Sequence, residues 1–509
     1  MAGFKQNNEI TYDDKELMEE NSFIGAEMEK SPLPVFEEEK DKLPKPLWEN
    51  HKSSVDCYWK AWEIAFSNLR QPKEGTGFVT NFIDAAFNDC IFMWDSAFML
   101  MFGKYADRIF KFQKTFDNFY SHQHDDGFIC RQIEEETGDD VFARHDPSST
   151  GPEVMTWCEW DYFLNFGDKE RLAKVFPCLV AYHQWMQEHF TWRDGTYFSS
   201  GYGCGMDNCP RLDEKYHVCY SHGHMIWVDA CMQELNACNI LLKMSDVLGR
   251  DEFKAELTEE RDRLYKVINE KLWDDETKFY YDKRNDDTFN GVKHIGAFWS
   301  LLAKCVPEDR KEDFIAHLNN ENEFRTDHRV PTLSKDHPEY RPEGRYWCGS
   351  VWAPTNYMVL KGLDEYGKYD MAYEIACNHL DWVTKVFEET GTVFENYAPE
   401  FQDGKEAKGN WSKADFVGWT GLVPISVMFE YVFGIRPDAE KNKITWHINL
   451  TDKHGVEKYP FGKDGELTLI CEKRNSEEEK PVVDIKSNVP VTVEIIWNNE
   501  KSKEIIDIK

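Results

Sequence analysis

Residues 97–110 read Ala-Phe-Met-Leu-Met-Phe-Gly-Lys-Tyr-Ala-Asp-Arg-Ile-Phe, a run with a helical hydrophobic period. Its apolar side chains recur at i, i+3, i+4 and i+7, for example at Phe98, Met101, Phe102 and Tyr105, which places them on one face of an α-helix. The same period dominates the chain between residues 46 and 436. It predicts a mainly α domain of helical hairpins, with helices over 97–120, 170–190, 226–248, 251–273, 293–305, 351–367, 369–388 and 420–433.

The pattern changes at both ends of this helical region. After residue 436, apolar and polar residues alternate over 443–450, 466–472, 481–485 and 491–497, which predicts the antiparallel strands of a small β-sandwich. Residues 1–45 are charged and interrupted by proline, a composition that predicts an extended arm. We therefore expect an N-terminal arm over 1–45, a helical domain over 46–436 and a C-terminal β-sandwich over 437–509.

The charge of the chain excludes some classes of partner. Its 509 residues include 93 acidic and 60 basic side chains, so the formal net charge is −33. Such a charge repels phosphate groups, and we expect neither nucleic acid nor an anionic membrane surface as a partner. The N-terminus lacks a basic region followed by an apolar one, and no stretch approaches the ~18 apolar residues of a membrane helix. These features predict a cytoplasmic protein and leave monomer and homo-oligomer undecided.

The 14 cysteines mostly stand singly among apolar residues, the pattern of buried, reduced thiols rather than of a disulfide scaffold. No Cys-x-x-Cys occurs, and the close pairs Cys204/Cys209 and His222/His224 lack a second pair at the spacing of a zinc site. The sequence therefore predicts no metal site.

Two carboxylates stand in aromatic or glycine-rich segments far apart in the chain. Asp207 lies in Gly-Cys-Gly-Met-Asp-Asn-Cys-Pro-Arg (203–211), and Glu395 lies in Val-Phe-Glu-Asn-Tyr-Ala-Pro (393–399). Cleavage of a glycosidic bond needs such a pair, with one carboxyl protonated and the other ionised. Both lie in loops where we expect the active site, which cover 122–132, 143–157, 193–222, 328–350 and 391–419. The alternatives are that Asp207 caps a turn and that Glu395 is a solvated surface residue.

Five motifs follow one another along the chain: Phe92-Met-Trp-Asp95, Gly205-Met-Asp-Asn208, Trp347-Cys-Gly-Ser-Val-Trp-Ala-Pro354, Phe394-Glu-Asn-Tyr397 and Gly418-Trp-Thr-Gly-Leu-Val-Pro-Ile425. In this order they resemble glycoside hydrolase family 63 and its mannosylglycerate-hydrolase-like relatives, and more distantly the trehalases and the catalytic domain of processing α-glucosidase I. The resemblance spans residues 50–435. It implies an (α/α)6 toroid, hydrolysis of an α-linked glycoside with inversion, and no metal or organic cofactor in the chemistry.

The resemblance also implies roles for single residues. Asp207 matches the general acid and Glu395 the general base, with carboxyl groups roughly 6.5–9.5 Å apart if the mechanism is inverting. Trp94 would be a platform for the sugar and Asp95 would accept from its hydroxyls, unless Asp95 only caps a helix over 96–102. Arg211 would pair with a carboxylate of the site or hold an anionic aglycone. The other predicted substrate-binding residues are Phe92, Trp157, Asn208, Tyr346, Trp347, Trp352, Asn356, Tyr397, Trp411 and Trp419.

Part of this set is expected to pack rather than to bind. We expect two or three of six residues to line the pocket, namely of Tyr346, Trp347, Trp352, Asn356, Trp411 and Trp419. The substrate stays open among small α-glucosides or α-mannosides, oligosaccharides and glycosylglycerates. An acidic aglycone needs a cation at the pocket, and the nearest candidates in the sequence are Arg144, Arg211, Lys215 and Arg345.

Two other functions remain open. A sugar epimerase of the same barrel type abstracts protons with bases deep in its cavity, and five histidines lie in or near the same loops, His122, His124, His145, His222 and His224. A non-catalytic sugar-binding protein would use the aromatic platforms without turnover.

Overall fold

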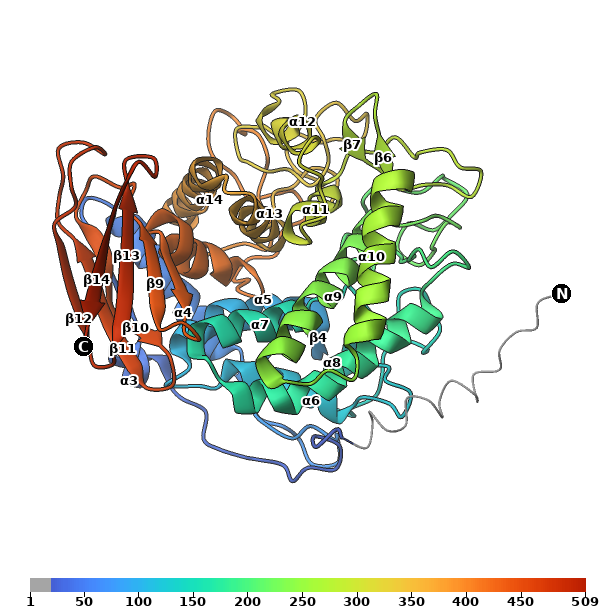
Figure 1. Cartoon of the computed structure of the whole chain (residues 1–509), viewed down its shortest axis with the longest axis horizontal. Coiled ribbons are helices and arrows are strands. Elements are labelled where there is room, and N and C mark those ends of the chain that lie inside the picture. Colours follow the sequence, from blue (N-terminus) through green and yellow to red (C-terminus); the bar gives the residue numbers. More distant parts are fainter. Residues whose placement is uncertain (1–19) are drawn as a thin grey trace.

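The computed structural model describes residues 20–509, so the first 19 residues of the predicted arm lie outside the described residues. Helices dominate up to residue 432 and strands follow (Figure 1). This confirms a mainly helical fold with C-terminal strands. The helices are α3 (Phe36–Glu39), α4 (Lys52–Ser67), α5 (Met93–Gly103), α6 (Thr115–Ser121), α7 (Met155–Phe166), α8 (Lys169–His189), α9 (Val228–Leu248), α10 (Lys254–Lys271), α11 (Trp299–Leu302), α12 (Lys311–Ala316), α13 (Ala353–Glu365), α14 (Tyr369–Thr390) and a π-helix (Val423–Val432).

Consecutive long helices pack against each other in pairs. The pairs α7 with α8, α9 with α10 and α13 with α14 are in contact, and α8 also contacts α9 (Figure 1). The first long helix, α4, packs against α14 and the π-helix at the end of the helical region. The two ends of this region therefore meet in space.

Several predicted helices differ from those observed. The helix predicted over 97–120 is divided into α5 and α6 by residues 104–114. Gly103 allows the chain to fold back there, because a Cβ on Gly103 would lie 2.4 Å from the side chain of Phe112. The segment 293–305 holds only a 3₁₀ turn (Ile295–Phe298) and α11. The segment 420–433 is a 3₁₀ turn (Thr420–Leu422) followed by the π-helix rather than an α-helix.

The C-terminal strands, together with one strand from near the N-terminus, form two four-stranded sheets. One has the order β14 (Ser502–Ile508), β13 (Val491–Trp497), β9 (Lys443–His447), β8 (Ile435–Asp438), and the other has the order β1 (Lys45–Trp48), β10 (His454–Phe461), β11 (Gly465–Cys471), β12 (Val483–Ser487). The pairing of β9 with β13 is parallel, and the other pairings in these sheets are antiparallel. Alternate residues of β13 are buried, as the period of two predicts.

Three two-stranded pairs lie within the helical region: β2 (Leu69–Arg70) with β3 (Phe82–Ile83), β4 (Cys90–Phe92) with β5 (Gln132–Glu134), and β6 (Trp273–Asp274) with β7 (Phe279–Tyr280). Strand β1 lies at the predicted end of the arm, yet it pairs with β10 of a C-terminal sheet. The domain boundaries after residues 45 and 436 stay predictions. The apolar core runs from the helices into both sheets, and the cysteines are unpaired thiols. Among residues 20–509, no helix is both long and apolar enough to cross a membrane.

Candidate active site

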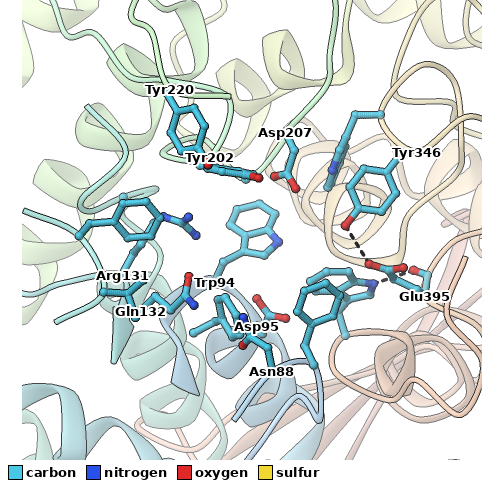
Figure 2. Close-up of a pocket in the computed structure, with 18 residues that line it drawn as sticks. Asn88, Trp94, Asp95, Arg131, Gln132, Tyr202, Asp207, Tyr220, Tyr346 and Glu395 are labelled. Atoms are coloured by element: carbon cyan, nitrogen blue, oxygen red, sulfur yellow. Dashed lines mark hydrogen bonds between the residues drawn. The ribbon is translucent and has the colours of Figure 1, made fainter. Parts of the chain in front are cut away.

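A cavity of about 350 Å³ opens among the loops that join the helices (Figure 2). This volume is near the lower end of the roughly 300–1,000 Å³ typical of ligand pockets, so it suits a small ligand. The cavity is lined by Phe87, Asn88, Phe92, Trp94, Asp95, Arg131, Gln132, Val141, Phe142, Gly151, Tyr202, Gly205, Asp207, Tyr220, Tyr346, Trp347, Glu395 and Trp419. Motifs from distant parts of the sequence therefore meet at one cavity.

Trp94 and Asp95 enter the pocket from the first turn of α5. Strand β4 pairs with β5, which sets Phe92 opposite Gln132 just before this helix. The helix begins at Met93 and its N-cap residue is Phe92, so Asp95 stands in the first turn and not at the N-cap position. Burial raises the pKa of Asp95 well above its usual range, and the charges of Glu395 and Asp207 add to this rise. A protonated Asp95 can donate to, as well as accept from, a bound hydroxyl.

Asp207 lies on the glycine-rich loop between α8 and α9. Gly205 has a φ of +75°, and a Cβ at this position would lie 3.2 Å from the indole of Trp94. A glycine therefore lets the loop and the ring approach this closely. Burial raises the pKa of Asp207 to about 6, although the charge of Arg131 opposes the rise. The carboxyl titrates near neutral pH, where it can act as a general acid.

Glu395 reaches the pocket from the loop after α14 and is 3% exposed, so it is not a solvated surface residue. Its Oε1 accepts a 3.0 Å hydrogen bond from the hydroxyl of Tyr346, and its Oε2 accepts a 3.2 Å bond from the backbone N–H of Lys413. Burial raises the pKa of Glu395 to about 7, while these two hydrogen bonds lower it and the charge of Asp207 raises it. Its backbone carbonyl accepts a 2.7 Å bond from Nε1 of Trp419, which ties two of the motifs together.

Arg131 is the only positively charged side chain among the described residues that line the pocket. Its guanidinium lies 4.5 Å from the ring of Phe142 and 5.1 Å from the ring of Tyr202, and its Nε donates to the carbonyl of Ser148 at 2.7 Å. Figure 2 shows the end of the guanidinium directed into the pocket. Sequence reasoning missed Arg131 and its neighbour Gln132. Both lie in the loop 122–132 that was expected to carry site residues, but no motif marks them.

Six of the predicted substrate-binding residues line the pocket, namely Phe92, Trp94, Asp95, Tyr346, Trp347 and Trp419. Tyr346, Trp347 and Trp419 belong to the set of six residues of which we expected two or three to line the pocket. The structure places the other seven outside this cavity: Trp157, Asn208, Arg211, Trp352, Asn356, Tyr397 and Trp411.

Arg211 is the clearest correction among the seven. Its guanidinium is buried and donates to both carboxylate oxygens of Asp229 at 2.6 and 2.7 Å and to both of Asp282 at 2.7 and 2.9 Å. With its donors used in this way, Arg211 holds the loop that carries Asp207, the acid loop, against α9 and does not line the cavity. It lies close to Asp207 in sequence, but its side chain points into the core.

Asn208 and Trp352 lie outside the cavity and contact Trp347, which lines it. The side-chain oxygen of Asn208 accepts from the backbone N–H of Trp347 at 2.8 Å, and its amide nitrogen donates to the carbonyl of Arg345 at 3.2 Å. Trp352 stacks on Trp347 with ring centroids 4.0 Å apart. Both residues therefore position Trp347, which lines the cavity.

Three of the remaining residues also pack or bond within the protein. Trp157 packs edge-on against other aromatic rings, the side chain of Asn356 bonds the backbone of Val330, and the hydroxyl of Tyr397 accepts from the N–H of Phe394. Trp411 differs, because it is 58% exposed and lines a shallower opening that Glu395 also lines.

None of the five histidines considered as bases lines the cavity. Both ring nitrogens of His122 are hydrogen-bonded to backbone carbonyls, and His124 pairs with Asp140 at 2.6 Å. The epimerase alternative therefore lacks its expected bases at this site.

The four cations considered for an acidic aglycone also lie outside the cavity. Arg144 pairs with Asp126 at 2.8 Å, Arg211 is buried as described, Lys215 is exposed, and Arg345 stacks on Trp411 at 4.6 Å. Arg131, which was not among these four, is the cation that lines the cavity among the described residues.

Comparisons with known proteins find relatives of this chain among the glycoside hydrolases. A model of the family described as the mannosylglycerate hydrolase MGH1-like glycoside hydrolase domain matches residues 90–420. A mannosylglycerate hydrolase of Thermus thermophilus is 25% identical over 403 residues, covering 64% of this chain and 93% of that protein. A probable mannosyl-oligosaccharide glucosidase of Schizosaccharomyces pombe is 23% identical over 296 residues, covering 51% of this chain but only 34% of that longer protein.

The fold is also found in a solved structure. The crystal structure of a GH63 mannosylglycerate hydrolase from Thermus thermophilus in complex with glucose superposes with a TM-score of 0.58, at 21% identity, over 73% of this chain and 99% of that chain. The family model covers more than half of the chain and includes both Asp207 and Glu395. The chain therefore belongs to the mannosylglycerate hydrolase MGH1-like glycoside hydrolase family and is a glycoside hydrolase.

Proposed function

We propose that the protein hydrolyses a small α-linked glycoside with inversion, with Asp207 as general acid and Glu395 as general base. One observation carries the proposal: two carboxyl groups from separate loops, each with a pKa raised toward neutrality, converge on one cavity lined by aromatic rings (Figure 2). The motif positions of both residues support the assignment of roles. The helix pairs and the contact of α4 with α14 and the π-helix support an (α/α)6 toroid, and the two C-terminal sheets support a β-sandwich.

The proposed reaction uses each carboxyl once. Asp207 donates its proton to the glycosidic oxygen while the bond from that oxygen to the anomeric carbon breaks. Glu395 accepts a proton from water while the water oxygen bonds to the anomeric carbon from the opposite face. The products are the free aglycone and the sugar with inverted configuration. No metal or organic cofactor takes part in these steps.

Aromatic rings and carboxyl groups would bind the sugar. Trp94 offers an indole beside Asp207, and its Nε1 has no hydrogen-bond partner among the described residues. This donor and the Asp95 carboxyl can bond sugar hydroxyls, while the ring packs on apolar C–H groups of the sugar.

Arg131 favours an acidic aglycone. Its guanidinium is held between two rings and faces a cavity in which it is the only cation among the described lining residues. A planar guanidinium can bind a carboxylate through two parallel hydrogen bonds. Within the open substrate classes, a glycosylglycerate therefore fits this chain better than a neutral disaccharide does.

Hydrolysis of a panel of α-glucosides, α-mannosides and glycosylglycerates tests the proposal. We expect release of free sugar from at least one member by the wild type, and release that is slower by about a hundredfold or more with Asp207→Asn or Glu395→Gln under the same conditions. Ligand binding by Asp207→Asn that stays near the wild-type level separates lost chemistry from lost folding. Full turnover in either variant contradicts the assigned roles.

A further inference from the structure

Three metal-ligating side chains meet outside the candidate active site, in the packing between α8, α9 and α10. His183 of α8, Cys238 of α9 and Glu260 of α10 place their ligand atoms within 4.8 Å of one another. They are 1%, 0% and 2% exposed, respectively. None of them lines the candidate active site. The group therefore requires an explanation of its own.

Two of the distances within the group match the spacing of ligand atoms around a metal ion. Nε2 of His183 lies 3.4 Å from Sγ of Cys238 and 3.4 Å from Oε2 of Glu260. An imidazolium that donated to Glu260 would come within about 2.7–2.9 Å of it, as Nδ1 of the same ring does with Glu234 at 2.7 Å. Ligand atoms about 2.0–2.3 Å from a tetrahedral metal ion lie roughly 3.3–3.6 Å apart.

The surrounding groups hold the ligands as the outer shell of a metal site does. Glu234 accepts from Nδ1 of His183, which directs the lone pair of Nε2 toward Cys238 and Glu260. The other oxygen of Glu260 accepts from the hydroxyl of Tyr197 and, at 3.1 Å, from Arg263. The side chains of His183 and Glu260 are thereby fixed in orientation.

Buried carboxyl groups surround the three proposed ligands. The carboxyl groups of Glu153, Glu234 and Glu260 are all buried, and Glu153 lies within electrostatic range of Glu234 and His183. One oxygen of Glu153 has no hydrogen-bond partner among the described residues. Arg263 and His183 are the positive groups in contact with these carboxylates. Once His183 is neutral, as metal coordination requires, Arg263 is the positive group left in contact with these carboxyl groups among the described residues, and a bound cation would offset their remaining charge.

We propose that His183, Cys238 and Glu260 bind one divalent transition-metal ion of the zinc class, with water as the fourth ligand. A thiolate and an imidazole select such an ion over calcium or magnesium. Metal binding displaces two protons to solvent, the Nε2 proton of the His183 imidazolium and the thiol proton of Cys238. The ion would join α8, α9 and α10, and α9 carries Asp229, which holds Arg211 of the acid loop. The site is structural and does not depend on the proposed reaction.

Metal analysis of the full-length protein tests the site directly. The chain is produced in zinc-supplemented medium, purified without a metal-affinity column, and analysed by plasma mass spectrometry. We expect about one zinc ion per chain in the wild type. After unfolding with a chelator, refolding with one equivalent of Co²⁺ should give the near-ultraviolet thiolate charge-transfer band and the intense visible bands of a four-coordinate site.

Matched serine variants separate metal loss from a packing defect. Cys238→Ser should lower the zinc content at least tenfold and remove the charge-transfer band. Cys178→Ser makes the same change at a buried cysteine of α8 outside the group and should keep both. A wild-type protein that holds no zinc after purification or after refolding with Zn²⁺, and whose thermal midpoint Zn²⁺ does not raise, would overturn the proposal. So would an unchanged zinc content in Cys238→Ser.

Discussion

The hydroxyl of Tyr346 donates a 3.0 Å hydrogen bond to Oε1 of Glu395. Tyr346 has a φ of +58°, a region that bulky residues rarely adopt and that costs roughly 1–3 kcal/mol where the surrounding structure imposes it. The hydrogen bond favours the ionised carboxylate and lowers the pKa of Glu395, while burial raises it to about 7. Tyr346 is therefore placed to tune the proposed base.

The wild-type pH profile should be bell-shaped. The proposed mechanism needs Asp207 protonated and Glu395 ionised, and their pKa values are about 6 and about 7. Because the acid has the lower pKa, only about one molecule in twenty carries the active pair of states at the optimum. We expect kcat/KM to peak near pH ~6.5, with limbs near pH 6 and 7. A profile without a falling limb above neutrality contradicts a protonated carboxyl as the acid.

Tyr346→Phe should broaden this bell and lower it. Loss of one hydrogen bond to a charged carboxylate, worth about 1.5–3 kcal/mol, raises the pKa of Glu395 by about one unit or more. Since Glu395 has the higher pKa of the pair, the alkaline limb should move up in pH, and the maximum of kcat/KM should fall about five- to tenfold or more. A rise of the acid limb instead would show that Glu395 titrates below Asp207.

Tyr340→Phe is the control for this change. Tyr340 also donates a 3.0 Å hydrogen bond to a glutamate, Glu400, but it lies outside the pocket. Its removal should leave the positions of both limbs unchanged. Equal shifts in the two variants would mean that the effect of Tyr346 is not specific to Glu395.

Hydrolysis of glycosyl fluorides should distinguish the role of Asp207 as acid from the role of Glu395 as base. Fluoride leaves without protonation, so Asp207→Asn should hydrolyse the α-glycosyl fluoride of the preferred sugar within about tenfold of the wild-type rate while losing about 10²–10⁴-fold on the natural glycoside. Glu395→Gln should lose activity on both substrates, because the attacking water still needs its base. The rates of fluoride release, measured with an ion-selective electrode, check this. If Glu395→Gln kept its activity on the fluoride and Asp207→Asn lost it, Glu395 would be the acid and Asp207 the base.

Arg131→Met should discriminate against an acidic aglycone. The variant removes the only cation among the described lining residues and replaces it with a side chain of similar length. We expect kcat/KM for the glycerate glycoside to fall about 10–100-fold, as expected for loss of a charged hydrogen bond of about 1.5–3 kcal/mol. The glycerol glycoside of the same sugar should lose much less.

Arg144→Met is the matched control, because Arg144 pairs with Asp126 outside the cavity. It should leave the ratio between the two substrates unchanged. Equal losses on the glycerate and glycerol glycosides in Arg131→Met would instead assign Arg131 to the sugar.

Gly205→Ala should disturb the sugar platform. The added Cβ would lie 3.2 Å from the Trp94 indole, at a φ of +75°. Overpacking of this kind costs about 1–3 kcal/mol, and displacement of Trp94 should lower kcat/KM about tenfold or more. Chemical denaturation and steady-state kinetics measure the two effects.

Gly249→Ala is the control that measures the effect of a positive φ on stability without a side-chain clash. Gly249 has a φ of +68°, and a Cβ there would meet nothing within 4 Å. It should lower stability by about 1–2 kcal/mol without changing kcat/KM. If Gly205→Ala and Gly249→Ala behave alike, contact between the acid loop and Trp94 is not important for catalysis.

The sequence predicts the pocket residues that stand in recognisable motifs. It does not predict those that tertiary contacts bring to the pocket. Trp94, Asp95, Asp207 and Glu395 stand in unusual strings of aromatic, glycine and acidic residues, and all four line one cavity. Arg131 joins them because the segment around it pairs with the strand before α5, a contact that no local pattern reveals.

The predictions that the structure corrects also failed because of tertiary contacts. Arg211 was placed at the substrate because it follows Asp207 closely, but two buried carboxylates draw its side chain into the core. The helical period over 97–120 continues through a fold-back that depends on the contact of Gly103 with Phe112. Hydrophobic periodicity identifies which residues are buried, and tertiary contacts decide where the chain turns.

The anomer released first from an α-linked substrate tests the central claim most directly. Proton NMR during the first minutes of hydrolysis, before mutarotation, distinguishes the two anomers of the free sugar. An inverting reaction between Asp207 and Glu395 predicts that the β-anomer appears first and then converts to the equilibrium mixture. Initial release of the α-anomer would mean a retaining mechanism and would contradict the proposed role of Glu395 as a base acting on water.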